Sequence, residues 1–294
     1  MIGVRSLKRW MRRRIEGIVA EAIAAESLDA PAFRQYVPYR PGDRAFVFPR
    51  RPTVATQEHR GLPLPPTSMY AGYGPTPEVY IELAERHVAT MRDLLAKSGL
   101  TLKPGARILD HGCAAGRMIR CLVDLADSCE IWGTDITAEH IYWCQQHLSP
   151  PFHFATTTMV PHLPFEDRSF TLIYCGSVFT HIDDLAAAWL LELHRILAPD
   201  GRAYITIHDD NTLELLRGKH ANSPFAAVVR ARGYENADRD EFGMLVFDRS
   251  RQWWLQTFYD VDYFCDRLLA PMFRVLSVTP AAYGYQTAII VERR

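Results

Sequence analysis

The chain has 294 residues, of which 48% are hydrophobic and 23% are charged, with 33 lysines and arginines against 34 aspartates and glutamates. This composition is typical of a globular protein and excludes collagen-like repeats, coiled-coil rods and wholesale disorder. The formal net charge of -1 gives no overall attraction for a polyphosphate backbone, so we expect no nucleic-acid partner. The six cysteines include no C-x-x-C pair, which favours a reducing compartment and predicts a cytoplasmic location.

The first 75 residues are predicted to form an N-terminal extension in two parts. Residues 5–27 place apolar side chains on one face of a helix and basic side chains on the other. Such a helix packs on its own protein, makes a contact within a homo-oligomer, or makes a peripheral contact with an anionic membrane. Ten of the 19 prolines lie between Pro31 and Pro77. They exclude long helices, and the aromatic residues among them favour a segment that wraps around the catalytic part.

From residue 76 onward the sequence alternates between strand and helix patterns. Thr76 can cap a helix that runs to Lys97. Short strands separated by helical stretches of about 10–15 residues indicate parallel βαβ units in a doubly wound sheet. Residues 76–294 are therefore predicted to form one domain, with an insertion at about 211–260. The predicted strands are 107–110, 130–135, 152–155, 170–175 and 202–207, and the predicted helices between them are 116–127, 137–148 and 183–197.

A loop of small residues follows the first of these strands. The run from Asp110 to Gly116 reads D-H-G-C-A-A-G, and small side chains let a ligand approach the backbone closely. The start of the next helix offers free N–H groups to anionic oxygen. A dinucleotide fingerprint would require glycine at 114 and glycine or alanine at 117, where the chain has Ala114 and Arg117. This disfavours a nicotinamide cofactor and leaves an oxidoreductase as the weaker alternative.

An acidic residue stands at the end of the second predicted strand. Asp135 lies 23 residues after Gly112, and its carboxylate can accept two hydrogen bonds from the cis hydroxyls of a ribose. Taken alone, Asp135 is equally well explained as a helix cap or a turn residue. Its position after the loop of small residues favours the ribose.

The loop resembles motif I, D-x-G-x-G-x-G, of the class I S-adenosylmethionine-dependent methyltransferases, with Ala114 in place of the middle glycine. Residues 163–175 resemble the family's approach to its fourth strand, and residues 177–182 resemble the S-V-F-T-H-L segment of one bacterial branch. The helix, turn and strand at 191–202 resemble the family's E-x-x-R-V-L-x-P-G-G. The resemblance implies a Rossmann-like fold with a seven-stranded, mostly parallel sheet, and S-adenosylmethionine as the cofactor.

The resemblance also implies which residues contact the cofactor. Asp135 would bind the ribose of the adenosyl group, and Ile136 would lie against adenine. The full set of cofactor-binding residues expected from this reasoning is Asp110, Gly112, Cys113, Ala114, Gly116, Arg117, Asp135, Ile136 and Ser177.

The implied reaction is a direct displacement, in which a nucleophile of the acceptor attacks the methyl carbon in line with the departing sulfur. The protein aligns the reactants and supplies a base if the acceptor is a hydroxyl. His181, just past the fourth strand, is the first candidate base because imidazole titrates near physiological pH. The alternative is a histidine that shapes the loop. His208 and Asp209 follow the fifth strand and are the next catalytic candidates, although Asp209 could instead cap the helix that follows.

The acceptor is less well defined by the sequence. The fourth strand ends in Tyr174-Cys175-Gly176-Ser177, without the Asn/Asp-Pro-Pro-Tyr/Phe motif of amino methyltransferases, which favours a hydroxyl of a small molecule or saccharide. The insertion, with Trp253 and Trp254 among its aromatic residues, is expected to cover the acceptor, unless these side chains only pack. We predict no metal site. The alternative function is a scaffold that binds S-adenosylmethionine and has lost turnover.

Overall fold

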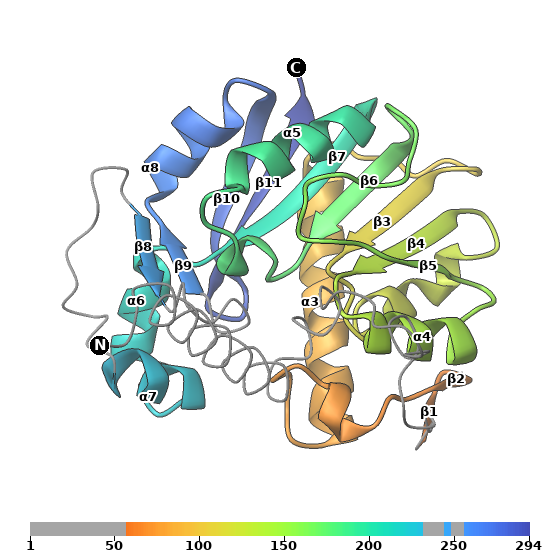
Figure 1. Cartoon of the computed structure of the whole chain (residues 1–294), viewed down its shortest axis with the longest axis horizontal. Coiled ribbons are helices and arrows are strands. Elements are labelled where there is room, and N and C mark those ends of the chain that lie inside the picture. Colours follow the sequence, from red (N-terminus) through yellow and green to blue (C-terminus); the bar gives the residue numbers. More distant parts are fainter. Residues whose placement is uncertain (1–56, 232–243, 248–255) are drawn as a thin grey trace, which may run out of the picture.

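The computed structural model describes residues 57–231, 244–247 and 256–294 (Figure 1). The predicted N-terminal amphipathic helix and most of the proline-rich segment lie outside the described residues, as do Trp253 and Trp254 of the insertion. Within the described part of the chain, no helix has both the length and the apolar character needed to cross a bilayer.

A seven-stranded sheet forms the centre of the molecule, with the strand order β10-β11-β7-β6-β3-β4-β5. Strand β11 runs antiparallel to both of its neighbours, and the other neighbouring pairs are parallel. This confirms the predicted doubly wound, mostly parallel sheet. The strands are β3 (Arg107–His111), β4 (Glu130–Asp135), β5 (His153–Thr156), β6 (Phe170–Cys175), β7 (Leu197–Ile207), β10 (Phe273–Tyr283) and β11 (Gln286–Arg293).

Both faces of the sheet are buried, because successive side chains of its strands point to opposite sides. Ile108 and Leu172 belong to one apolar core, and their neighbours Leu109 and Ile173 belong to the other. The first core is closed by α3 (Pro77–Lys97), η2 (Ile119–Leu125) and α4 (Ala138–His147). The second is closed by α5 (Ala186–Ile196) and by α8 (Val261–Tyr263) with the η6 turn (Phe264–Leu269) that continues it (Figure 1).

The chain order creates a crevice beside β3. From β3 the chain moves outward through β4 and β5, then returns to the other side of β3 to form β6. The segments that follow β3 and β6 therefore leave the sheet in opposite directions at its carboxyl edge, which is where open α/β sheets bind their ligands.

Helix α3 begins where the sequence predicted it. The Thr76 side chain accepts a hydrogen bond from the N–H of Val79, and Pro77 occupies the first turn. The helix predicted over 116–127 is shorter, because only Ile119–Leu125 forms a helix, of the 3-10 type. Gly116 has φ of +76°, a left-handed conformation that belongs to the loop and cannot be part of a right-handed helix.

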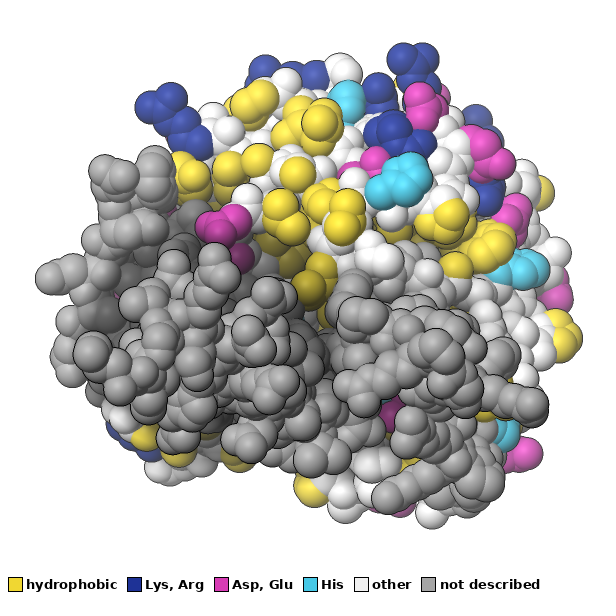
Figure 2. Space-filling model, in the orientation of Figure 1, with side chains coloured by type: hydrophobic (Ala, Val, Ile, Leu, Met, Phe, Trp, Pro, Cys, Tyr) yellow, Lys and Arg dark blue, Asp and Glu magenta, His cyan; other side chains and the backbone are white. Residues whose placement is uncertain are grey.

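The described parts of the insertion and residues 57–76 lie around this layered core. Helices α6 (Asp210–Arg217) and α7 (Pro224–Ala231) form a lobe with strands β8 (Met244–Phe247) and β9 (Gln256–Tyr259), to the left in Figure 1. Figure 2 shows the face that carries α5, where hydrophobic side chains gather. Leu191 of α5 is one of the exposed hydrophobic residues of the described chain. The smaller elements are β1 (Glu58–His59), β2 (Leu62–Pro63), η1 (Thr67–Met69) and η3 (Phe179–His181).

Candidate cofactor and active site

The loop after β3 is a backbone cradle. Gly112, Ala114 and Gly116 have φ of +83°, +47° and +76°, so three of its residues adopt the left-handed conformation. A Cβ at Gly112 would collide with the side chain of Val178, and a Cβ at Gly116 would lie 2.5 Å from Leu148. Glycine is therefore required at both positions. Ala114 adopts a left-handed conformation that costs a non-glycine residue about 1–2 kcal/mol.

The Asp135 carboxylate lies directly against this cradle. Its Oδ2 accepts a hydrogen bond of 2.8 Å from the N–H of Ala114, and its Oδ1 accepts one of 2.7 Å from the N–H of Thr137. The hydrogen bond from Thr137 is the kind of turn contact that the sequence allowed as the alternative role of Asp135. Each carboxylate oxygen keeps a second lone pair, because it can accept two hydrogen bonds. Gly112 and Asp135, which are 23 residues apart in the sequence, therefore belong to one site. The Asp135 carboxylate can still accept hydrogen bonds from two hydroxyl groups.

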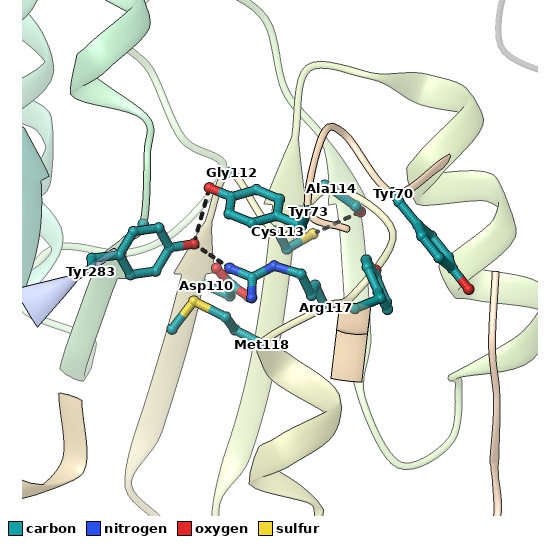
Figure 3. Close-up of a pocket in the computed structure, with 11 residues that line it drawn as sticks. Tyr70, Tyr73, Asp110, Gly112, Cys113, Ala114, Arg117, Met118 and Tyr283 are labelled. Atoms are coloured by element: carbon teal, nitrogen blue, oxygen red, sulfur yellow. Dashed lines mark hydrogen bonds between the residues drawn. The ribbon is translucent and has the colours of Figure 1, made fainter. Parts of the chain in front are cut away.

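A pocket of about 320 Å³, part of it open to solvent, lies above the loop. Tyrosine side chains form much of its wall (Figure 3). Five of the predicted cofactor residues line it, whereas Gly116, Asp135, Ile136 and Ser177 lie outside its wall. The lining residues are Tyr70, Tyr73, Tyr80, Asp110, Gly112, Cys113, Ala114, Arg117, Met118, Gly176 and Tyr283.

Two oppositely charged residues line the pocket without forming an ion pair. Asp110 is 3% exposed, and burial raises its pKa to about 7. Its Oδ2 has no hydrogen-bond partner among the described residues. Arg117 is 4% exposed and lies between Tyr73 and Tyr283, with its charged carbon 3.8 Å from the centre of the Tyr73 ring (Figure 3). Burial also raises the pKa of the Cys113 thiol, which keeps it protonated.

Ser177 lies two residues after the end of β6 and has a strained backbone conformation. Its φ is +61°, and its N–H donates a 2.7 Å hydrogen bond to the hydroxyl of Thr206 on β7. The Gln286 amide donates a 2.9 Å hydrogen bond to the Ser177 hydroxyl and accepts one of 2.7 Å from Thr206. Neighbouring strands thus fix the backbone of Ser177 at the carboxyl edge of the sheet, where such strain is often found at functional positions.

The candidate bases differ in their surroundings. His181 ends η3 and is exposed, and its Nδ1 lies 3.3 Å from the amide nitrogen of Gln256. His208 is 2% exposed and packs against Phe225, Phe258 and Tyr285. Burial holds the pKa of His208 well below its usual value, so its ring stays neutral.

Asp209 caps the helix that follows it, α6. Its carboxylate accepts hydrogen bonds from the N–H and hydroxyl of Thr212, which forms a capping box with it at the start of α6, and from the hydroxyl of Thr287. Neither His208 nor Asp209 lines the pocket. The structure therefore gives Asp209 the alternative role that the sequence allowed, that of a helix cap.

The residues that surround Arg117 were not predicted from the sequence. Tyr73 comes from the N-terminal segment, His87 from α3 and Tyr283 from the end of β10. The only available signal was the tyrosines among the prolines, since nothing in the local sequence connects Tyr283 to the loop. Among the described residues, no group of three or more His, Cys, Asp or Glu side chains is arranged to hold a metal ion.

Comparison with known proteins agrees with this geometry. Residues 109–205 match a family described as a methyltransferase domain, and the sheet has the fold of the class I S-adenosylmethionine-dependent methyltransferases. Among solved structures, an S-adenosylmethionine-dependent methyltransferase from Clostridium acetobutylicum superposes on 71% of this chain and 92% of its own, with a TM-score of 0.51 and 13% identity. That similarity shows the fold, and S-adenosylmethionine is the cofactor of the family.

The relatives of this methyltransferase domain are larger proteins. Phosphoethanolamine N-methyltransferase 3 of Arabidopsis thaliana is 28% identical over 155 residues, which are 51% of this chain and 29% of that protein. Sterol 24-C-methyltransferase erg6 of Schizosaccharomyces pombe is 29% identical over 105 residues, which are 34% of this chain and 27% of that protein. The chain thus spans less than a third of the length of these curated relatives.

Proposed function

We propose that the protein transfers the methyl group of S-adenosylmethionine to a hydroxyl of a small molecule or saccharide. The observation that supports this most strongly is the 2.8 Å hydrogen bond from the N–H of Ala114 to the Asp135 carboxylate. It places this carboxylate, which can accept further hydrogen bonds, beside the glycine cradle. Gly112 and Ala114 of that cradle also line the pocket. The residues present therefore fit an adenosyl cofactor.

Each part of the cradle has a role toward the cofactor. Asp135 would accept hydrogen bonds from the ribose hydroxyls, and the half-buried Ile136 beside it would cover adenine. Asp110, Cys113 and Ser177 would surround the other end of the cofactor, nearest β6. Gly116 supports the loop from behind, where it packs on Leu148.

When bound, S-adenosylmethionine supplies a methyl group that its sulfonium already activates. The residues of the chain then hold the acceptor in line and accept its proton. His181 is the proposed base. The amide nitrogen of Gln256 lies 3.3 Å from its Nδ1; as placed it donates to Nδ1, which leaves the ring proton on Nε2. Turning this amide so that its oxygen accepts from Nδ1–H would move the basic lone pair to Nε2, the form in which His181 would act as the base.

The proposal of an oxygen acceptor is supported by the end of β6. Its Tyr174-Cys175-Gly176-Ser177 sequence lacks the Asn/Asp-Pro-Pro-Tyr/Phe motif of amino methyltransferases. The relatives include proteins named for N- and C-methylation, so the acceptor atom has to be measured.

The deciding experiment incubates the protein with S-adenosylmethionine labelled with ¹³C at the methyl group and a panel of hydroxylated, amino and olefinic small molecules, including saccharides. The carbon chemical shift of the labelled product distinguishes methyl groups on oxygen, nitrogen and carbon. We expect an O-methyl product. An N- or C-methyl product would overturn the oxygen acceptor, and tight cofactor binding without any product across the panel would favour the scaffold.

A further inference from the structure

Arg117 is a buried cation held almost entirely by aromatic residues. Tyr73 covers the face of its guanidinium, with 3.8 Å from the charged carbon to the ring centre. Its Nη2 contacts the hydroxyl of Tyr283 and lies 3.2 Å from Nδ1 of His87. No acidic side chain of the described residues forms a salt bridge with it. Burying an unpaired charge costs several kcal/mol, so such a site needs an explanation.

The direction of each hydrogen bond around Arg117 follows from the fact that a guanidinium can only donate. Nδ1 of His87 must therefore accept, and the imidazole must be neutral with its proton on Nε2. Burial, reinforced by the charge of Arg117, lowers the pKa of His87 to about 3, in agreement with that form. The Tyr283 oxygen also accepts from Arg117, and its O–H donates to Tyr73 over 3.2 Å. Both hydrogens of Nη2 are therefore used.

The other terminal nitrogen, Nη1, is buried and has no hydrogen-bond partner among the described residues. Arg117 lines the same pocket as Asp110, whose Oδ2 also lacks a partner. A cation and an acid that face one pocket without pairing match a ligand group with both charges, such as an α-amino acid. A phosphate would suit Arg117, but it would be repelled by Asp110 in its ionised form.

We propose that Arg117 binds the carboxylate of the cofactor's amino-acid end through Nη1, and that Tyr283 and His87 are positioning residues that hold its guanidinium for this contact. The inference rests on the proposed function. Because Nη2 is held from two sides and the ring of Tyr73 covers the guanidinium face, the Nη1 donors are oriented before the ligand arrives, which reduces the ordering required on binding.

The test compares two ligands by calorimetry. S-adenosylhomocysteine carries the amino-acid end, whereas 5′-methylthioadenosine keeps the adenosine and the sulfur but lacks it. In Tyr283→Phe, which removes one hydroxyl, we expect the Kd of S-adenosylhomocysteine to rise about 10-fold or more and that of methylthioadenosine to stay within about 2-fold. His87→Leu should behave in the same way, and His87→Gln, which restores an acceptor, should recover much of the loss.

Tyr204→Phe is the matched control. Tyr204 is a buried tyrosine of strand β7, and its hydroxyl has no partner among the described residues, so neither Kd should change. Equal weakening of both ligands in Tyr283→Phe would reduce Tyr283 to a structural role and overturn the inference.

A wild-type protein that binds the two ligands equally, or that releases S-adenosylhomocysteine in millimolar inorganic phosphate, would overturn the carboxylate assignment. Binding of neither ligand would instead overturn the proposed function.

Discussion

The hydroxyl of Tyr283 accepts a hydrogen bond from Arg117, which lies 166 residues earlier in the chain. The contact joins β10, at one edge of the sheet, to the turn after the interior strand β3. Tyr283 also touches Tyr73 of the N-terminal segment. Three distant parts of the sequence therefore meet above the glycine cradle, and changes at any of them should affect cofactor binding.

The stability of the protein should fall when Gly112 of the glycine cradle is replaced and should change little when Ala114 is replaced. Gly112→Ala should destabilise the protein by about 2 kcal/mol or more, because the new Cβ meets Val178 at a positive φ. Ala114→Gly should change the free energy of unfolding by less than about 1 kcal/mol, because relief of strain and a more flexible unfolded chain offset each other. Urea denaturation measures both. Equal effects of the two variants would show that Val178 does not confine the loop.

The stability of the protein should depend on the protonation of Asp110. Burial raises the pKa of this carboxyl from 3.8 to about 7, so its neutral form is favoured in the fold. The stability that it contributes is complete below about pH 4, falls as the pH rises toward 7, and is constant above that. Measured against Asp110→Asn in urea, the wild type should lose a few kcal/mol across this window. Parallel curves for the two proteins would show that folding does not raise the pKa of Asp110.

Asp209 should matter for stability and not for chemistry. Asp209→Ala removes the cap of α6 and the contact with Thr287, and we expect a loss of about 1–3 kcal/mol in the free energy of unfolding. Asp209→Asn keeps a capping oxygen and should lose less. Calorimetry with S-adenosylhomocysteine should give an unchanged Kd for both variants. A stable Asp209→Ala protein that has lost turnover would restore the catalytic role.

His181 can be tested with the acceptor that the labelled-product assay identifies. His181→Ala should lower kcat by about 10²–10⁴ if the imidazole accepts the hydroxyl proton, and should leave the Kd of S-adenosylhomocysteine unchanged. Gln256→Leu, which removes the amide beside Nδ1, should shift the acidic limb of the kcat profile against pH. A loss of cofactor affinity without a change in kcat would place His181 among the residues that shape the loop.

The sequence was sufficient to predict the sheet and to place Asp135 beside the loop that follows β3. The strand pattern is strong because both faces of the sheet are buried, so each strand is a short apolar run. Asp110, Gly112 and Asp135 could be placed together because each lies at or next to the end of a strand, and the carboxyl ends of parallel strands share one edge.

The other end of the site could not be predicted in the same way. Tyr73, His87 and Tyr283 converge on Arg117 only through tertiary packing, and none of them lies in a local motif that specifies a ligand. The helix after the loop was predicted too long because its start depends on the φ of Gly116, which sequence patterns do not reveal.

The central claim is that the cradle at 112–116 and the carboxylate of Asp135 together bind an adenosyl cofactor. The most direct test is calorimetric titration of S-adenosylhomocysteine into the wild type and Asp135→Ala, with the melting curve of each protein as the control for folding. We predict micromolar or tighter binding to the wild type and at least about a 100-fold loss in the variant, since two charge-assisted hydrogen bonds disappear. A folded Asp135→Ala protein with unchanged affinity would contradict the account.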